Sequence, residues 1–206
     1  MNISVNNIKT NLSAVDFKAD KGLIFSFISI CTGLISGAVI TEFFNNQVKE
    51  DTLAVFLSFF TEITDKSKAE IFSGIATEGL IYFLALFICG SNVFGKELSL
   101  IFTAVKSAGI SSIITALYSQ YGLRGFEYCL LVFMPGKSFF LFSMLYMTKC
   151  SYVFSKSLRS GLNGNTLKSA KNIFAVKSAV ALTLMLISWT ADFLTLIFFS
   201  SLFSFE

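Results

Sequence analysis

Histidine is absent from this chain of 206 residues, and proline occurs only once. Without imidazole the chain lacks the commonest general base and metal ligand, so no zinc- or iron-type cluster can be assembled. Charged residues are scarce too, at 14%, whereas an ordinary soluble domain has about 25%. The formal net charge of +3 is too small to indicate nucleic acid. We therefore expect no metal, no cofactor and no nucleic-acid partner.

The cysteines form no paired pattern. Four are present, and each lies inside or at the end of an apolar stretch: Cys31, Cys89, Cys129 and Cys150. A free cysteine in such a setting behaves as a small buried apolar residue. We interpret all four as packing residues, without a disulfide framework.

Long apolar blocks separated by short charged loops dominate what remains. A bilayer core of roughly 30 Å requires about 20 apolar residues in one helix. Five blocks reach this length, near residues 22–43, 71–90, 98–119, 126–148 and 173–200. The sequence therefore predicts an all-α, polytopic membrane helix bundle of about five transmembrane helices, with one integral membrane domain over residues 22–200.

The distribution of lysine and arginine predicts the orientation. Residues 1–21 are polar, and the apolar block after them is too long for a signal peptide. If this segment is cytoplasmic, nine basic residues lie inside, namely Lys9, Lys18, Lys21, Lys96, Lys149, Lys156, Arg159, Lys168 and Lys171. Four lie outside, namely Lys49, Lys66, Lys68 and Arg124. The positive-inside rule favours a cytoplasmic N-terminus and an extracytoplasmic tail at residues 201–206.

The first external loop has its own amphipathic pattern. Within residues 49–68, apolar side chains recur at helical spacing at Leu53, Phe56, Leu57, Phe60 and Ile63, with charged residues around them. Such a segment is typical of a helix that lies in the outer membrane interface. It either covers the bundle or forms a docking surface, so Leu53, Phe56, Phe60 and Ile63 are candidate partner-binding residues. The basic loop 151–172 is interpreted as a topological anchor, with contact to anionic lipid or a partner as the alternative.

Small residues in two blocks indicate close helix packing. Gly33 and Gly37 form a GxxxG motif in the first span, a spacing that lets two membrane helices approach. In the third span, small residues repeat at four-residue spacing with a glycine beside them: Ala104, Ala108, Gly109 and Ser112. We expect these faces to pack within the chain, with dimerisation as the alternative.

Ionisable residues inside the spans are candidate functional groups, because a charge at the bilayer centre costs at least about 3 kcal/mol. Three are expected deep in the membrane: Glu78, Lys106 and Lys137. Glu127, Lys177 and Asp192 are expected near an interface, within reach of water. Lys137 follows Pro135 and Gly136, which should break the fourth span and free backbone carbonyls. A Glu78–Lys137 pair is possible, either as a structural ion pair or as part of a transport site.

These features resemble a known family. The chain runs from Glu78 through EGLIYFLALFICGSNVFGKELSLIFTAVKSAG and then ITALYSQYGLRGFEYCLLVFMPGKSFFLFSML. The order is an apolar span ending in glycine, a span with a lysine before small residues, a GxxG turn at Gly122 and Gly125, and a span interrupted by proline. This order is similar to that of the stage II sporulation protein M family of endospore-forming bacteria, over about residues 25–200.

The resemblance implies a membrane scaffold and not an enzyme. Members act in engulfment, and they assemble with stage II sporulation proteins P and D, which carry the peptidoglycan hydrolase activities. We therefore expect this chain to anchor such hydrolases at the septal, mother-cell membrane. The alternative is a small permease or permease subunit that uses the intramembrane Lys and Glu residues. An intramembrane enzyme is a third possibility, but no nucleophile in the sequence has an evident base beside it.

Overall fold

The computed structural model describes residues 21–43, 67–160 and 164–199, and within these ranges the chain forms helices joined by short turns, with no strand. The elements are α2 (Lys21–Phe43), α4 (Lys68–Gly90), α5 (Gly95–Tyr128), the π-helical turn η1 (Cys129–Phe133), α6 (Met134–Arg159) and α7 (Gly164–Phe199). The predicted all-α fold is confirmed for the described residues. The amphipathic segment of the first loop lies outside them, apart from its last two residues.

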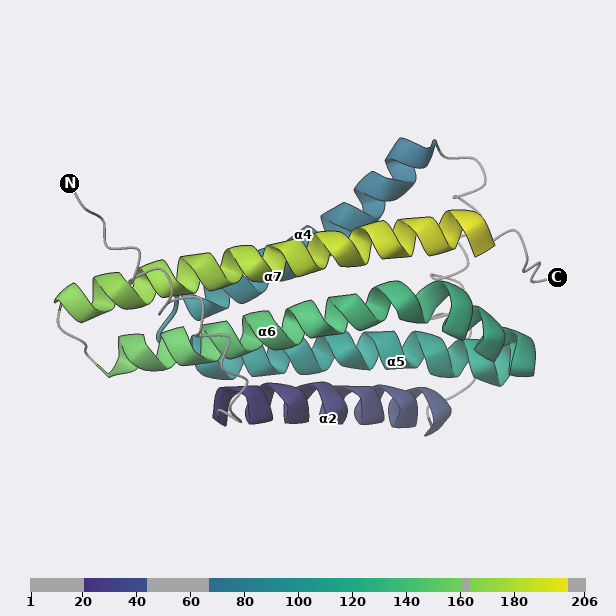
Figure 1. The fold of residues 1–206 in the computed structure, drawn as a ribbon. Coiled ribbons are helices and arrows are strands. Elements are labelled where there is room, and N and C mark those ends of the chain that lie inside the picture. The colour runs from purple at the N-terminus through teal and green to yellow at the C-terminus, as the bar shows by residue number, and fades with distance from the viewer. Residues whose placement is uncertain (1–20, 44–66, 161–163, 200–206) are drawn as a thin grey trace.

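Four helices in the described part of the chain are long and apolar enough to cross a membrane. One of them, Gly95–Arg159, contains 65 residues and includes α5, η1 and α6. The sequence predicted about five spans, and the counts differ because α5, η1 and α6 follow one another without an intervening loop. Nevertheless α5 and α6 lie side by side, since the helical chain turns back on itself (Figure 1).

Glycine makes this reversal possible. Gly122 has φ 55° and ψ −130°, a conformation outside the helical region that side chains rarely tolerate. Gly125 lies so close to the preceding turn that an added Cβ would sit 2.2 Å from the carbonyl oxygen of Leu117. The GxxG pair of the sequence is therefore a tight turn between two antiparallel helices.

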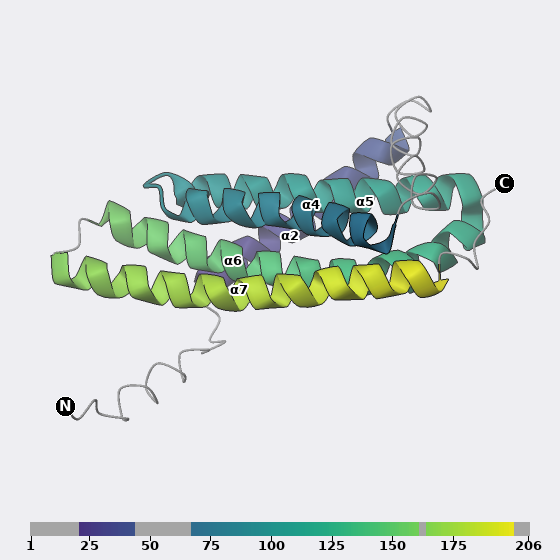
Figure 2. The ribbon, with the colours of Figure 1, turned by 90° about the horizontal axis from the view of Figure 1, so that it is seen from above.

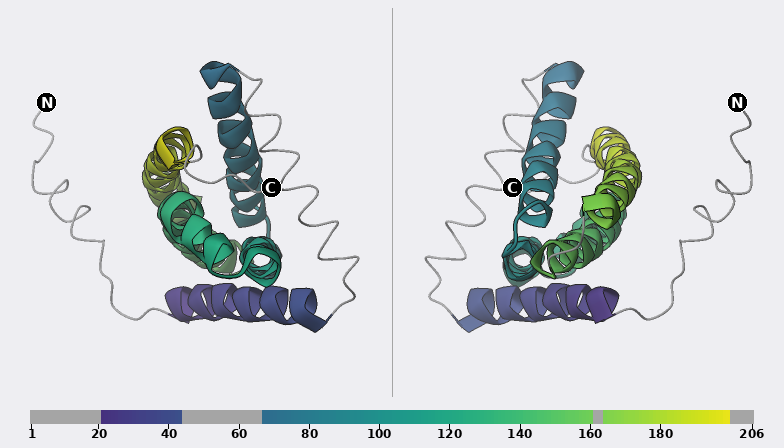
Figure 3. Two further views of the ribbon diagram at one scale, coloured as in Figure 1. Left: turned by 90° about the vertical axis from the view of Figure 1, so that its right-hand side faces the viewer. Right: turned by 90° about the vertical axis from the view of Figure 1, so that its left-hand side faces the viewer.

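Two layers are visible in the arrangement of the helices. Seen end-on, α4, α5, α6 and α7 form an arc, and α2 lies across the outside of α5 (Figure 3). The view from above shows that α2 crosses α5 obliquely (Figure 2). α2 packs mainly on α5 and less on α6, whereas α6 and α7 run together along most of their length.

The interior of the bundle contains many hydroxyl groups, and the exterior is apolar. Large apolar side chains such as Ile81, Val105 and Phe142 are exposed on the outside. Buried Ser and Thr residues instead occupy helix contacts: Ser26, Ser99, Thr103, Ser107, Ser143, Thr148, Ser151 and Ser188. Small and hydroxylated residues are enriched at contacts between membrane helices. The packing is therefore that of a membrane bundle.

Aromatic side chains fill the end of the bundle near the α4–α5 turn. The rings of Phe87, Phe174 and Phe154 stack in succession, with centroid distances of 5.3 Å and 4.6 Å. The Ser155 hydroxyl donates to the carbonyl oxygen of Val93 at 3.0 Å and accepts the Lys96 N–H at 2.9 Å. These contacts fix the α4–α5 turn against α6, and so they fix the depth of the charged residues further along each helix.

Candidate functional site

A buried ion pair joins α6 to α7. Lys137 Nζ lies 3.2 Å from Asp192 Oδ2, and 18% and 10% of the two side chains are exposed. Gly136 makes the approach possible, because a Cβ at this position would sit 1.9 Å from Asp192 Oδ1. Any side chain at residue 136 would push α7 away and separate the pair.

A second ion pair joins α4 to α5. The Lys106 ammonium donates a hydrogen bond to Glu78 Oε1. Lys106 is largely buried, with 13% of its side chain exposed, whereas 52% of the Glu78 side chain is exposed. Glu78 is 12 residues from Gly90 at the end of α4, which corresponds to roughly 18 Å along the helix axis. The pair therefore lies deep within the apolar part of the bundle.

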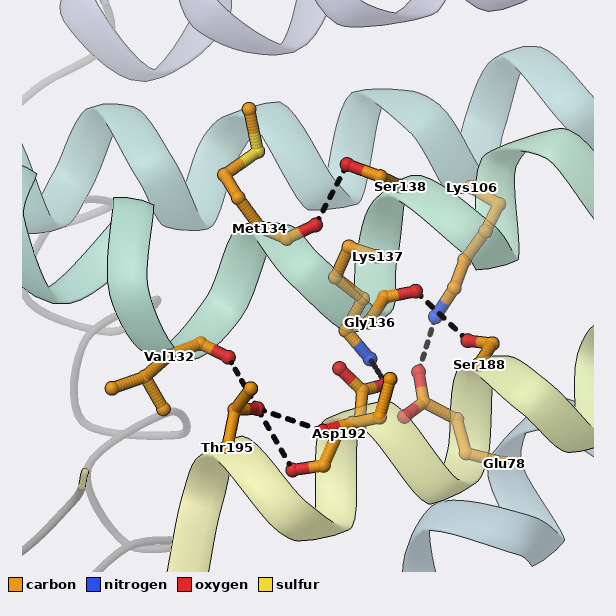
Figure 4. A network of polar contacts seen from close by, with 11 residues as sticks. Glu78, Lys106, Val132, Met134, Gly136, Lys137, Ser138, Ser188, Asp192 and Thr195 are labelled. Atoms are coloured by element: carbon orange, nitrogen blue, oxygen red, sulfur yellow. Dashed lines mark hydrogen bonds and ion pairs between the residues drawn. The ribbon is translucent and has the colours of Figure 1, made fainter. Parts of the chain in front are cut away.

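The two pairs lie together as one charge cluster, consisting of Glu78, Lys106, Lys137 and Asp192 (Figure 4), and aromatic rings lie beside its lysines. The Phe140 ring centroid is 5.7 Å from Lys106 Nζ and 5.8 Å from Lys137 Nζ. Lys106 Nζ also lies 4.2 Å from the Tyr82 ring centroid. A cation over an aromatic face is favourable, and more so when water is excluded. The cluster holds two positive and two negative groups, so its formal charges balance.

The region around Pro135 keeps its carbonyls satisfied. The backbone does not break there, because five residues of π-helix, Cys129–Phe133, lead directly into α6. The interruption expected at Pro135 takes the form of a change from π-helix to α-helix, and the chain stays helical through it. Side chains of α7 bond the carbonyls of this stretch: Thr195 Oγ1 donates to Val132 O at 2.9 Å, and Ser188 Oγ donates to Gly136 O at 2.9 Å (Figure 4). The π turn accommodates the proline, and the hydroxyls of α7 donate hydrogen bonds to carbonyl oxygens of this stretch.

The structure brings the three predicted intramembrane residues together, but the pairing differs from the one considered from the sequence. Glu78 pairs with Lys106, and Lys137 pairs with Asp192. Asp192 was expected near an interface and within reach of water, and its side chain is buried between α6 and α7, where it pairs with Lys137. The sequence contains a pattern that indicates this burial, because one face of α7 carries polar residues at helical spacing, namely Ser188, Asp192 and Thr195.

The small residues lie where α2 meets α5. A Cβ on Gly33 would sit 2.3 Å from Ala104 O, and one on Gly37 would sit 2.2 Å from Ala108 O. Ser112 Oγ donates to Gly37 O at 3.3 Å. Gly109 does not belong to this contact, because a Cβ there would have no atom of the described helices within 4 Å. Its inclusion in the α2–α5 packing face was therefore wrong for the part of the chain that the structure describes.

The remaining candidates are not positioned by the structure. Leu53, Phe56, Phe60 and Ile63 lie outside the described residues. Among the described residues, no three His, Cys, Asp or Glu side chains come together in a group that could hold a metal ion.

The chemistry available to the charge cluster is electrostatic and conformational. Each ammonium has a carboxylate within reach, so the cost of placing four charges in an apolar region is offset by mutual attraction. The pairs connect α4 to α5 and α6 to α7, while Phe140 lies between the two lysines. The cluster is thus suited to hold four helices in register.

When the chain is compared with known proteins, no protein family, no curated protein and no solved structure matches it.

Proposed function

We propose that this chain is a non-catalytic membrane scaffold that holds peptidoglycan hydrolases at the septal membrane during engulfment. The observation that carries the proposal is that the four charged groups inside the bundle pair with one another. Each ammonium has a carboxylate partner, and hydroxyls such as Ser143 and Ser151 bond carbonyls of neighbouring helices at 2.8 Å and 2.9 Å. A bundle fixed in this way is suited to hold a partner and not to move a substrate.

The proposed topology has five spans, a cytoplasmic N-terminus and an extracytoplasmic C-terminus. The reversal at Gly122 supports it, because it divides the 65-residue apolar segment into two antiparallel parts. With the native cysteines replaced by serine, Leu123→Cys should react with an impermeant maleimide in intact cells. Asn92→Cys should react only after the membrane is opened. The reverse pattern would overturn the orientation, and labelling of both residues would overturn the five-span topology.

The proposed partners are hydrolases resembling stage II sporulation proteins P and D, and the amphipathic segment of the first loop is their proposed contact outside the membrane. Its support is the sequence pattern, in which Phe56 and Phe60 are four residues apart, the spacing that places two side chains on one face of a helix.

The test is affinity purification of the tagged full-length protein from membranes of engulfing cells, with identification of the bound proteins. The wild-type protein should retain hydrolases. The double variant Phe56→Ser/Phe60→Ser should lose most of them at normal abundance, while Glu62→Gln, on the polar side of the same segment, should retain them. Absence of hydrolases from the wild-type sample would contradict the scaffold function. Their retention by the double variant would contradict only the contact.

A permease subunit is the second candidate, and the depth of the charge cluster favours it, since polar groups at mid-membrane mark many substrate and proton paths. Reconstitution in proteoliposomes containing a pH-sensitive dye tests this candidate. A permease that moves protons should give a flux that Lys137→Leu abolishes. A scaffold should give no flux above that of empty liposomes.

A further inference from the structure

The charge cluster is not equally enclosed at all four members. The side chains of Lys106, Lys137 and Asp192 are 10–18% exposed, whereas that of Glu78 is 52% exposed. Glu78 lies halfway along α4, between Lys68 and Gly90, so water at either end of the helix is out of its reach. A carboxylate thus faces outward from the bundle at a depth where lipid would otherwise surround it.

Only one of the two Glu78 oxygens is engaged by the described residues. Oε1 accepts the hydrogen bond of Lys106, and no described residue donates to Oε2. An ionised carboxylate can accept several hydrogen bonds, and one left unmade in an apolar medium is unfavourable. The arrangement therefore calls for a donor from outside the described bundle.

The surface around Glu78 leaves room for another helix. Gly74 lies one turn before Glu78 on the same face, and a Cβ there would have no atom of the described residues within 4 Å. By contrast Gly79, on the inner face, is closed by the Trp189 ring. Thr77 and Ile81 are exposed beside Glu78. An open glycine next to a polar acceptor is the type of surface on which membrane helices associate.

From this geometry we propose that the outer face of α4, formed by Gly74, Thr77, Glu78 and Ile81, docks a transmembrane helix of a partner protein. That helix carries an uncharged hydrogen-bond donor, namely Ser, Thr, Asn or Gln, level with Glu78 Oε2. An uncharged donor fits because the cluster already balances two ammonium groups against two carboxylates. A second copy of this chain docked through the same face would instead bring two Glu78 carboxylates together. This proposal rests on the scaffold function in one respect: we expect the partner to be a hydrolase or a component bound to one.

The test uses photo-crosslinking of the full-length protein in native membranes. Benzoylphenylalanine is placed at Ile81, and in a control at Val105, which is exposed on α5 next to Lys106 and so at a similar depth. The Ile81 probe should join the chain to one membrane protein, and the Val105 probe should not. Replacing the donor in the partner's helix with alanine should lower the yield about three- to tenfold, as expected for one hydrogen bond between membrane helices.

Two variants separate docking from folding. Glu78→Leu leaves Lys106 without its carboxylate. Glu78→Leu/Lys106→Leu removes one positive and one negative charge, so the rest of the cluster stays neutral. Both should lose the Ile81 crosslink, and the double variant should do so at normal abundance. Glu78→Gln keeps an acceptor and should retain most of the yield.

Several outcomes would overturn the docking face. One is equal crosslinking from the Ile81 and Val105 probes. Another is crosslinking of the Ile81 probe only to lipid, to a second copy or to another part of the same chain. A third is an unchanged yield in the double variant. If the double variant keeps both the Ile81 crosslink and its hydrolases, the docking face is wrong and the scaffold function stands. If the Ile81 probe captures a donor-bearing helix and no hydrolase co-purifies with the wild-type protein, the docking face stands and the scaffold function is wrong.

Discussion

The α2–α5 contact and the α6–α7 contact hold helices together in opposite ways. Between α2 and α5, Gly33 and Gly37 have no side chains, and the backbones meet directly at Ala104 and Ala108. Between α6 and α7, the contact is formed by side chains that bond across it, including the Lys137–Asp192 pair. The α2–α5 contact depends on the absence of side chains at the two glycines, and the α6–α7 contact depends on side chains that bond their partners. Steric change should therefore damage the first, and loss of a partner should damage the second.

The largest expected effect comes from breaking the α6–α7 pair on one side. Asp192→Asn keeps the size of the side chain but leaves Lys137 without its hydrogen-bonded carboxylate and the two buried ammonium groups with Glu78 as their one counter-charge, and we expect a loss of about 3–5 kcal/mol of stability. The measurement is the loss of helical circular dichroism as sodium dodecyl sulfate is added to the protein in mixed micelles.

The matched control removes both charges. Lys137→Gln/Asp192→Asn leaves two amides that can bond to each other, so most of the lost stability should return. A double variant as unstable as the single one would mean that the charges themselves, and not their imbalance, determine stability at this contact.

The next effect tests the steric contact. Gly37→Ala places a methyl group 2.7 Å from the Cα atom of Ala108, which only separation of α2 from α5 can relieve. We expect a loss of about 1–3 kcal/mol in the same unfolding measurement.

Gly109→Ala is the control for this substitution. The position is open, so the helical preference of alanine should leave stability unchanged or raise it by up to about 1 kcal/mol. Equal effects of the two substitutions would show that α2 and α5 do not approach at Gly37.

The smallest effect concerns a single hydroxyl of the α6–α7 contact. Thr195→Val removes the hydrogen bond to Val132 O, and one such bond between membrane helices is worth about 0.6 kcal/mol on average. Thr183→Val is the control, because that hydroxyl bonds Val180 O of its own helix. The difference between their unfolding midpoints measures the bond across the helices. No difference would exclude Thr195 from the stabilising contacts.

The helices and their approximate ends could be predicted from the sequence, because a long apolar block determines a membrane helix almost by itself. α2 and α4 begin within a few residues of the predicted blocks. The partners of the charged residues could not be predicted, since the sequence gives the depth of a side chain but not the rotation of its helix. Glu78 was therefore considered with Lys137, and its partner is Lys106.

Local context decided the remaining differences. Pro135 was expected to break the fourth span, but the π turn before it and the hydroxyls of α7 preserve the helix. Gly109 has the same small size as Gly37, yet it faces away from the contact. Neither outcome can be derived from one helix alone, because both depend on what the neighbouring helix presents.

The central claim is that the charge cluster stabilises a scaffold and does not form a substrate path. The most direct test is recovery of bound hydrolases with the Lys137→Gln/Asp192→Asn double variant in engulfing cells. Because this variant keeps a bonded pair without charge, we expect wild-type abundance, wild-type recovery of hydrolases and normal engulfment. Loss of engulfment at normal abundance and with the hydrolases still bound would contradict the account, because it would show that the charges themselves perform the function.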